Sequence, residues 1–174
     1  MAFKREITYF EAPGEENTLT VLASAKARAQ ELGIKHVLVP SVRGISAEKA
    51  LDFFAGTGFT LFFVGTDPAR FSGETKERIA SSAFELAFYK EVDYHYPDEV
   101  KNAFRRFGQG TKVAVEITLI AAQEEIVEPG AEVVALGGSA KGLDTALVIK
   151  AATSDEFYEL EICEILCKPR KTKT

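Results

Sequence analysis

The sequence predicts an α/β fold of three layers, a mainly parallel sheet between helices with an antiparallel edge strand near the C-terminus. Three observations favour it. Short apolar segments alternate with amphipathic helical segments in the first half of the chain. The segments at 36–39 and 60–64 are almost continuously apolar, which is typical of strands buried on both faces. Two later strand-like segments are joined by a loop too short for a helix, which indicates antiparallel pairing.

Composition and length indicate one globular domain. The chain has 174 residues, of which 46% are hydrophobic and 27% charged. We assign the domain to residues 1–167 and expect a basic, mobile tail at 168–174. A formal net charge of −5 argues against a nucleic-acid partner but allows a local anion site. No apolar run approaches the ~18 residues that span a bilayer, and the N-terminus lacks an apolar signal core, so we expect a cytoplasmic protein without a membrane partner.

The first half of the chain alternates strands and helices, with turn residues between them. Asn17 is a favourable N-cap before a helical apolar stripe, and Gly33 stands where helices commonly stop. Ala47, Ala50 and Leu51 begin a second stripe, which ends at a Gly-Thr-Gly turn. These signals predict strands at 7–10, 36–39 and 60–64, and helices at 19–32 and 47–55.

The second half gives weaker signals, above all between residues 69 and 107. His95 stands between two tyrosines and is a candidate proton-transfer group, with a packing role as the commoner alternative. The run at 112–125 suits a mostly buried helix with Glu116 on its apolar face. There the carboxylate either pairs with a basic group, which we favour, or is functional with a shifted pKa. Helices are predicted at 74–84, 98–107 and 112–125, and strands at 86–89, 131–136, 145–149 and 158–166. Cys163 and Cys167 would be two buried apolar residues of the last strand.

The turn between the second strand and the second helix carries the clearest functional chemistry. It contains Ser41, Arg43, Gly44 and Ser46, which supply two hydroxyls, a guanidinium and a flexible backbone position. The N-terminus of a helix offers unpaired N–H groups and a partial positive charge to an anion, and an arginine suits a phosphate. The alternative is that Ser46 only caps its helix and Arg43 is a solvated charge.

A glycine-rich loop at 137–144 is the second candidate for anion binding. Gly137, Gly138 and Ser139 follow a strand directly and could wrap an anion with backbone N–H groups. The loop lacks the Gly-Lys-Ser/Thr ending of a P-loop, and a hairpin connection alone would also explain its glycines. In open α/β sheets ligands bind beyond the carboxyl ends of the strands. This loop and those at 13–18, 41–46 and 65–67 all fall at that edge.

Four blocks of the chain resemble a family of stand-alone proteins related to the C-terminal α/β domain of pyruvate kinase. They are residues 9–18 (YFEAPGEENT), 108–117 (GQGTKVAVEI), 137–149 (GGSAKGLDTALVI) and 164–170 (EILCKPR). The resemblance covers most of the chain, but the match is poor between 69 and 107. In pyruvate kinase the corresponding strand-to-helix turn is a Ser/Thr-rich loop that holds a sugar phosphate of the allosteric effector. Residues 41–46 look like that loop, with Val42 and Ile45 in place of more polar residues.

The stand-alone family is associated with bound FMN, so the resemblance implies FMN or a related small phosphate ester as the ligand. We expect the 41–46 turn to hold the phosphate, Asn17 and Thr18 to contact the ligand or order the neighbouring loop, and the glycine-rich loop to line the other wall. The expected binding residues are Asn17, Thr18, Ser41, Arg43, Gly44, Ile45, Ser46, Gly137, Gly138, Ser139 and Asp144.

The resemblance implies a ligand more firmly than a reaction, and three hypotheses remain. The first is an FMN-binding or phosphate-ester-binding protein. The second is an enzyme, either a flavin-dependent oxidoreductase or a phosphate-ester hydrolase, with Glu11, Glu116 and Asp144 as candidate acid–base groups that could equally be structural. The third is a regulatory, effector-sensing module without catalysis that acts through a partner or as a homo-oligomer. The catalytic residues stay unknown, and the sequence shows no metal-ligand cluster.

Overall fold

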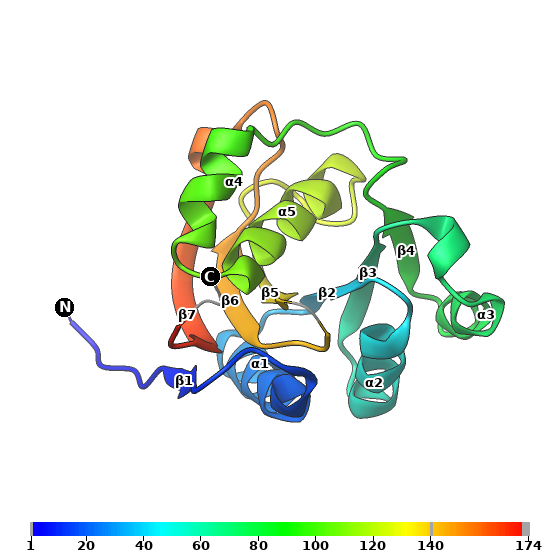
Figure 1. Cartoon of the computed structure of the whole chain (residues 1–174), viewed down its shortest axis with the longest axis horizontal. Coiled ribbons are helices and arrows are strands. Elements are labelled where there is room, and N and C mark those ends of the chain that lie inside the picture. Colours follow the sequence, from blue (N-terminus) through cyan, green and yellow to red (C-terminus); the bar gives the residue numbers. More distant parts are fainter. Residues whose placement is uncertain (1, 140, 172–174) are drawn as a thin grey trace.

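A computed structural model describes residues 2–139 and 141–171 and confirms the mainly parallel α/β sheet. Within these residues seven strands form one sheet in the order β1-β7-β6-β5-β2-β3-β4 (Figure 1). Strand β6 is antiparallel to both neighbours, and every other pairing is parallel. The strands are β1 (Thr8–Phe10), β2 (His36–Ser41), β3 (Thr60–Gly65), β4 (Glu85–Phe88), β5 (Glu132–Gly137), β6 (Thr145–Lys150) and β7 (Glu161–Pro169).

Helices cover both faces of the sheet and complete the three layers (Figure 1). On one face lie α1 (Thr18–Leu32), α2 (Ile45–Phe54) and α3 (Gly73–Ser81). On the other face α5 (Gln109–Gln123) lies against the sheet, and α4 (Asp98–Arg105) packs beside it. Short 3₁₀ turns at Glu15–Asn17, Pro68–Arg70 and Phe157–Glu159 lie in the connections. None of the helices in the described ranges is long and apolar enough to cross a membrane.

The continuous apolar strands have the double burial that their sequences predict. Phe62 and Phe63 are neighbours in β3, yet they point to opposite faces and belong to two separate cores. Phe63 packs with residues of α1, α2 and α3, whereas Phe62 packs with the apolar side of α5. Burying one such side chain contributes about 2 kcal/mol to stability, so the central strands need helices on both faces.

The C-terminal end of the sheet differs from the expectation in two respects. Strand β6 is the predicted antiparallel strand, but it lies third from the edge because β7 and β1 add outside it. Strand β7 continues to Pro169, and the N–H of Arg170 donates to the carbonyl of Phe10 at 2.9 Å. The first residues of the expected mobile tail at 168–174 are therefore held by β1. Residues 172–174 lie outside the described part of the chain.

The helix boundaries agree with most of the local signals. Gly33 closes α1 in the left-handed conformation with φ of 71°, as predicted. Asn17 is at the N-cap position of α1 but makes no capping hydrogen bond, because its side-chain amide donates to the carbonyl of Ala12 at 2.9 Å. Cys167 is buried as expected, but Cys163 is exposed. The register of β7 shifts twice against β6, so the simple alternation assumed for its side chains fails.

Candidate functional site

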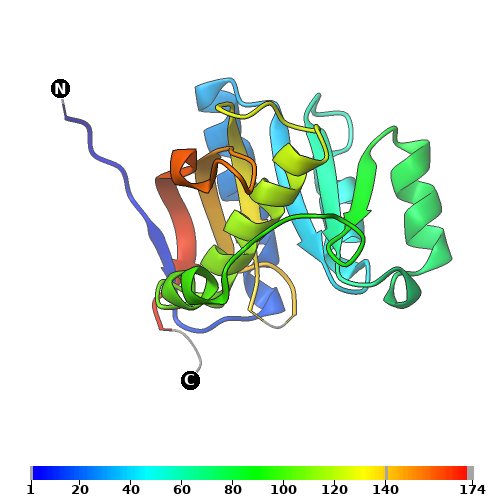
Figure 2. The same cartoon turned by 90° about the horizontal axis from the view of Figure 1, so that it is seen from above.

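A cavity of about 760 Å³ opens at the carboxyl edge of the sheet. Figure 2 shows the end of β2 at the same edge as the loop that follows β5. The cavity is lined by the ends of β2 and β3, the first turn of α2, one side of α4, one side of α5 from Gln109 to Ile120, and the loop after β5. Tyr89 and Tyr94, from the segment between β4 and α4, also line it. The cavity therefore lies where open α/β sheets bind ligands, beyond the carboxyl ends of the strands.

The 41–46 turn forms one wall of the cavity and is organised by Ser41. The hydroxyl oxygen of Ser41 accepts hydrogen bonds from the backbone N–H groups of Gly44 at 3.1 Å and Ala47 at 3.3 Å. Gly44 is the N-cap residue of α2 and is left-handed, with φ of 95°. Ser46 lies inside the helix, so the alternative that Ser46 is the cap is wrong and Ser41 does the capping. The N–H groups of Ile45 and Ser46, in the first turn, have no acceptor within α2.

Arg43 stands at the rim of this wall. Its side chain is exposed and lines the cavity, and it forms no ion pair with the described residues. Val42 and Ile45 flank it, and 45% and 56% of their surfaces are exposed. The wall therefore combines an unpaired guanidinium and free helix N–H groups with two exposed apolar side chains at the mouth.

The opposite wall is formed by cationic side chains of α4 and α5. Lys101 and Arg105 stand one helical turn apart on α4, and Lys112 comes from the first turns of α5. The guanidinium Nε of Arg105 donates to Gln109 at 3.1 Å. With Arg43 and Lys141, five cations line the cavity against the three carboxylates of Glu15, Asp98 and Glu116. The cavity is thus locally positive in a chain of net charge −5.

Glu116 forms a buried network with Lys112 and Tyr94. Its Oε2 lies 2.6 Å from the Nζ of Lys112, and only 15% and 10% of the two side chains are exposed. The phenol of Tyr94 donates to the Oε1 of Glu116 at 3.0 Å. Burial first, and then the charge of Glu116, raise the pKa of Tyr94, so its hydroxyl remains a donor at neutral pH. The favoured expectation for Glu116, pairing with a basic group, matches this geometry.

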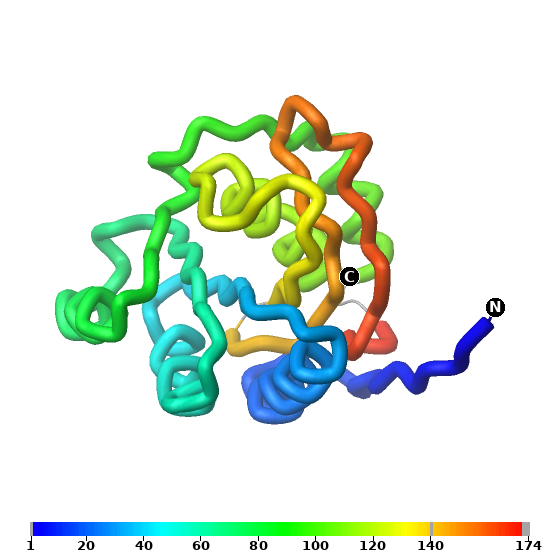
Figure 3. Tube along the Cα trace, turned by 180° about the vertical axis from the view of Figure 1, so that it is seen from behind, coloured from blue at the N-terminus to red at the C-terminus, as the bar shows by residue number. Residues whose placement is uncertain are grey.

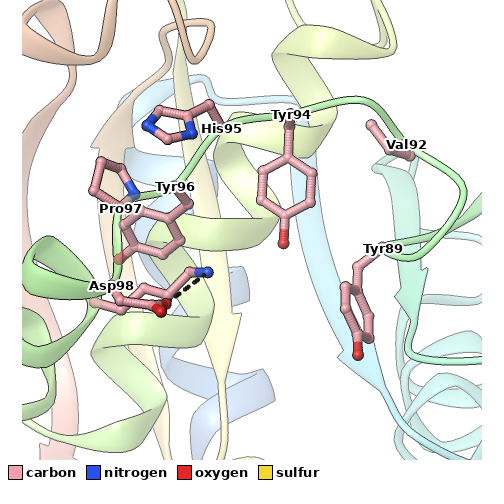
Figure 4. A pocket seen from close by; sticks show the side chains of 8 residues that line it. Tyr89, Val92, Tyr94, His95, Tyr96, Pro97 and Asp98 are labelled. Carbon is pink, nitrogen blue, oxygen red and sulfur yellow. Dashed lines mark hydrogen bonds and ion pairs between the residues drawn. The ribbon is translucent and has the colours of Figure 1, made fainter.

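The segment between β4 and α4 crosses above the cavity. Figure 4 shows Tyr89 and Tyr94 with their rings directed down from this segment, and His95 turned away from Tyr94. The segment also lines a smaller outer pocket of about 470 Å³, which shares Tyr89, Tyr94, Asp98 and Lys101 with the main cavity. His95 lines only the outer pocket, is exposed, and uses its backbone N–H to bind Ser154 at 3.0 Å. The structure therefore places its imidazole away from the main cavity.

The predicted binding residues fall into two groups. The residues that line the cavity are Ser41, Arg43, Ile45, Ser46, Gly138 and Ser139. The residues that do not line it are Asn17, Thr18, Gly44, Gly137 and Asp144. Gly44 belongs to the 41–46 turn, Asn17 binds the carbonyl of Ala12, and Thr18, Gly137 and Asp144 shape the loop after β5.

Two residues of the second group, Thr18 and Asp144, hold the loop after β5 in place. The hydroxyl of Thr18 accepts the N–H of Leu143 at 3.0 Å. Asp144 is fully buried and accepts hydrogen bonds from the N–H of Ser139 at 3.0 Å and the hydroxyl of Thr145 at 2.8 Å. Burial raises the pKa of Asp144, and these bonds oppose the rise. Asp144 is thus a structural acceptor for Ser139, which does face the cavity.

Gly137 allows the end of β5 to pack closely against the start of α5. A Cβ on Gly137 would lie 2.0 Å from the carbonyl oxygen of Gly110, at the start of α5. The two glycines allow the N-terminal turn of α5 to approach the end of β5. This contact brings the cationic wall to the sheet edge, although neither glycine touches the cavity.

Several lining residues were not predicted from the sequence, among them Thr66, Tyr89, Tyr94, Lys101, Arg105 and Lys112. A signal existed for two pairs, because Lys101 with Arg105 and Lys112 with Glu116 are spaced i, i+4 on helices. Thr66 follows β3, and its hydroxyl is buried with no hydrogen-bond partner among the described residues. Such an unpaired group at the cavity is available to a ligand.

Comparison with known proteins leaves the family open. No family model matches the chain. A crystal structure of a pyruvate kinase from Cryptosporidium parvum is similar with a TM-score of 0.46 and 14% sequence identity. The match covers 76% of this chain and 22% of that one, so this chain spans about a fifth of that protein's length. The strand order and layers described above establish the α/β fold.

Proposed function

We propose that this protein binds a small phosphate-bearing ligand, FMN or a related phosphate ester, in the cavity at the carboxyl edge of the sheet. The observation that carries the proposal is the 41–46 turn. There Ser41 caps α2 through Ala47 and leaves the N–H groups of Ile45 and Ser46 without intrahelical acceptors, beside Arg43, which forms no ion pair within the described ranges. This donor set suits the phosphate end of the ligand.

The strength of the phosphate site follows from two kinds of donor, the N–H groups at the start of α2 and the guanidinium of Arg43. A helix N-terminus contributes about 0.3–1 kcal/mol to a nearby anion. A hydrogen bond to a charged group contributes about 1.5–3 kcal/mol, and Arg43 can make two in parallel. The exposed position of Arg43 lowers these values, because water and salt screen the charge. We therefore expect Arg43 to supply a factor of about 10 to 100 in affinity.

The rest of the cavity suits a ligand larger than phosphate. Its volume of about 760 Å³ is within the range of roughly 300–1,000 Å³ found for small-molecule sites. Val64, Val113, Ile117 and Ile120 give it an apolar surface, and the hydroxyl of Thr66 offers one buried polar contact. A flat ring with polar edges, as in FMN, matches this mixture. FMN supplies electron-transfer chemistry when bound, and the part of this chain's residues is to bind and orient it.

Binding can be tested with the purified protein. FMN is added while its absorbance and fluorescence are followed, and calorimetry gives the affinity; a sugar phosphate and inorganic phosphate are tested as competitors. We expect saturable binding of FMN or another phosphate ester. We expect Arg43→Ala to weaken it about 10- to 100-fold. Arg106→Ala is the matched control, because Arg106 is an exposed arginine outside the cavity.

Two results would refute the proposal. One is a failure of FMN and other phosphate esters to bind to folded protein. The other is an equal effect of the Arg43 and Arg106 substitutions, since binding would then not involve the 41–46 turn. If a sugar phosphate displaced FMN, the proposed site would stand, and the sugar phosphate would replace FMN as the proposed natural ligand.

A further inference from the structure

The N-terminal arm, residues 2–7, leads into β1 at the edge of the sheet and projects away from the body of the molecule (Figures 1 to 3). Strand β1 pairs with β7 on one side, and its other side has no strand partner among the described residues. The arm forms no regular structure of its own. Its backbone donors and acceptors are therefore accessible beside an unpaired sheet edge.

The arm and β1 carry three exposed apolar side chains. Phe3 is 75% exposed, Ile7 38% and Tyr9 54%. Edge strands that avoid pairing often carry proline or charged side chains; residues 2–10 contain no proline, and their charges are Lys4, Arg5 and Glu6. The exposed apolar side chains at positions 3, 7 and 9 would lie on the same face if the arm became a strand. This pattern favours addition of another strand.

The sequence of the arm is complementary to itself. An antiparallel pair alternates hydrogen-bonded and non-hydrogen-bonded residue pairs, so an exact two-fold axis must pass between two copies of the same residue. With the axis at Arg5, Lys4 faces Glu6 of the partner subunit, and Phe3 faces Ile7 of the partner subunit. The first pair joins opposite charges and the second joins apolar side chains, each twice in the dimer.

Arg5 itself would face Arg5 of the partner subunit. Each guanidinium already forms an ion pair with Glu31 of its own chain, which reduces the repulsion. Moving the axis to Lys4 sets Phe3 against Arg5 of the partner subunit, and moving it to Glu6 sets two carboxylates together. The register centred on Arg5 is therefore the one of the three that pairs opposite charges with each other and apolar side chains with each other.

We propose that two copies of this chain associate through antiparallel pairing of their N-terminal arms, with the two-fold axis at Arg5. The contact is isologous, as expected for a symmetric dimer, and joins the two sheets at their β1 edges. None of the residues that line the cavity belongs to the arm. The contact is independent of the ligand proposed above.

The test measures the mass in solution as a function of concentration by light scattering and sedimentation. We expect a species of twice the chain's 19.0 kDa for the intact protein. Lys4→Glu places like charges opposite each other twice per dimer, and we expect it to weaken the dimer about tenfold. The double variant Lys4→Glu with Glu6→Lys exchanges the charges and should restore the wild-type affinity.

Two further variants complete the test. Ile7→Asp places a charge against Phe3 of the partner subunit and should abolish the dimer at concentrations where the wild type is dimeric. Lys35→Glu is the matched control for Lys4→Glu, because Lys35 is exposed in the loop before β2 and its reversal changes the net charge by the same amount. In the dimer, hydrogen exchange at amides of residues 3–7 should be slowed. A monomer at all concentrations, a dimer indifferent to Ile7→Asp, or failure of the double variant to restore association would overturn the proposal.

Discussion

The two walls of the cavity are built in different ways. The wall at the 41–46 turn comes from one short stretch of the chain, and its donors are backbone N–H groups together with Arg43. The wall at α4 and α5 comes from side chains separated along the chain, and its charges already have partners in the protein, such as Glu116 for Lys112. The first wall is open to an anion, whereas much of the second is committed to its own network.

We infer that the first wall serves ligand binding, whereas the second wall mainly stabilises the fold. Substitution of the exposed Arg43 in the first wall should mainly change ligand affinity, because its guanidinium forms no ion pair with the described residues. Mutations in the second wall should mainly change stability, because Tyr94, Lys112 and Glu116 join the crossing segment to α5. The following predictions test this division, from the largest expected effect to the smallest.

Glu116→Gln should lower the free energy of unfolding by about 2 kcal/mol. The substitution keeps an acceptor for Tyr94 but leaves the ammonium of Lys112 in a largely buried place without its carboxylate. Chemical denaturation measures the loss. Glu161→Gln, which breaks the exposed pair with Lys150, is the control and should cost far less, because solvent screens that pair.

The double variant Glu116→Gln with Lys112→Met separates the two explanations for that loss. If the unpaired ammonium causes it, the second substitution should return a large part of the stability. A double variant less stable than Glu116→Gln alone would show that the second wall depends on Lys112 in some other way.

Gly44→Ala should lower stability by about 1–2 kcal/mol and also weaken anion binding. A non-glycine residue is strained at φ of 95°, and its Cβ would lie 2.8 Å from the hydroxyl oxygen of Thr75. Gly33→Ala is the matched control, since Gly33 has φ of 71° but no atom within 4 Å of the added Cβ, and it lies outside the cavity. Calorimetry with FMN and thermal unfolding measure the two effects. Equal losses of affinity in the two variants would count against a local role for the turn.

Asp144 should make the stability of the protein fall slightly as pH rises. Because burial raises its pKa in the folded state, the folded protein binds the proton more tightly than the unfolded chain. This contribution to stability is present below the unfolded pKa and is lost as pH rises through the folded pKa. The stability of the wild type relative to Asp144→Asn should therefore fall with rising pH, as measured by denaturation at a series of pH values.

Asp67 provides the control of opposite sign. The ammonium of Lys90 and then the N–H of Ala69 hold the pKa of Asp67 below its usual value. Its contribution is present above the unfolded pKa and is lost as pH falls through the folded pKa. The stability of the wild type relative to Asp67→Asn should rise with pH. The same slope for both comparisons would contradict the assignment for Asp144.

Local sequence signals were sufficient for most elements of the fold. The apolar strands at β2 and β3, the stripe of α2 and the helical stop at Gly33 depend on neighbouring residues, and the structure has all of them. The position of β6 within the sheet depended instead on where β7 and β1 add, which involves residues far apart in the sequence. The mobile tail was predicted to begin at residue 168, which is too early, because the carbonyl of Phe10, far away in the sequence, binds the N–H of Arg170.

The same distinction applies to the cavity. The Ser41 turn follows from local sequence, since a strand end, a glycine and a helix start are contiguous and their hydrogen bonds are local. That Lys101, Arg105 and Lys112 face this turn depends on how distant segments pack. Their placement depends on the close approach of Gly110 to Gly137 and on the crossing segment held by Tyr94, contacts between residues that no local pattern relates. Periodicity indicates which face of a helix is buried, but packing between distant segments decides what the other face meets.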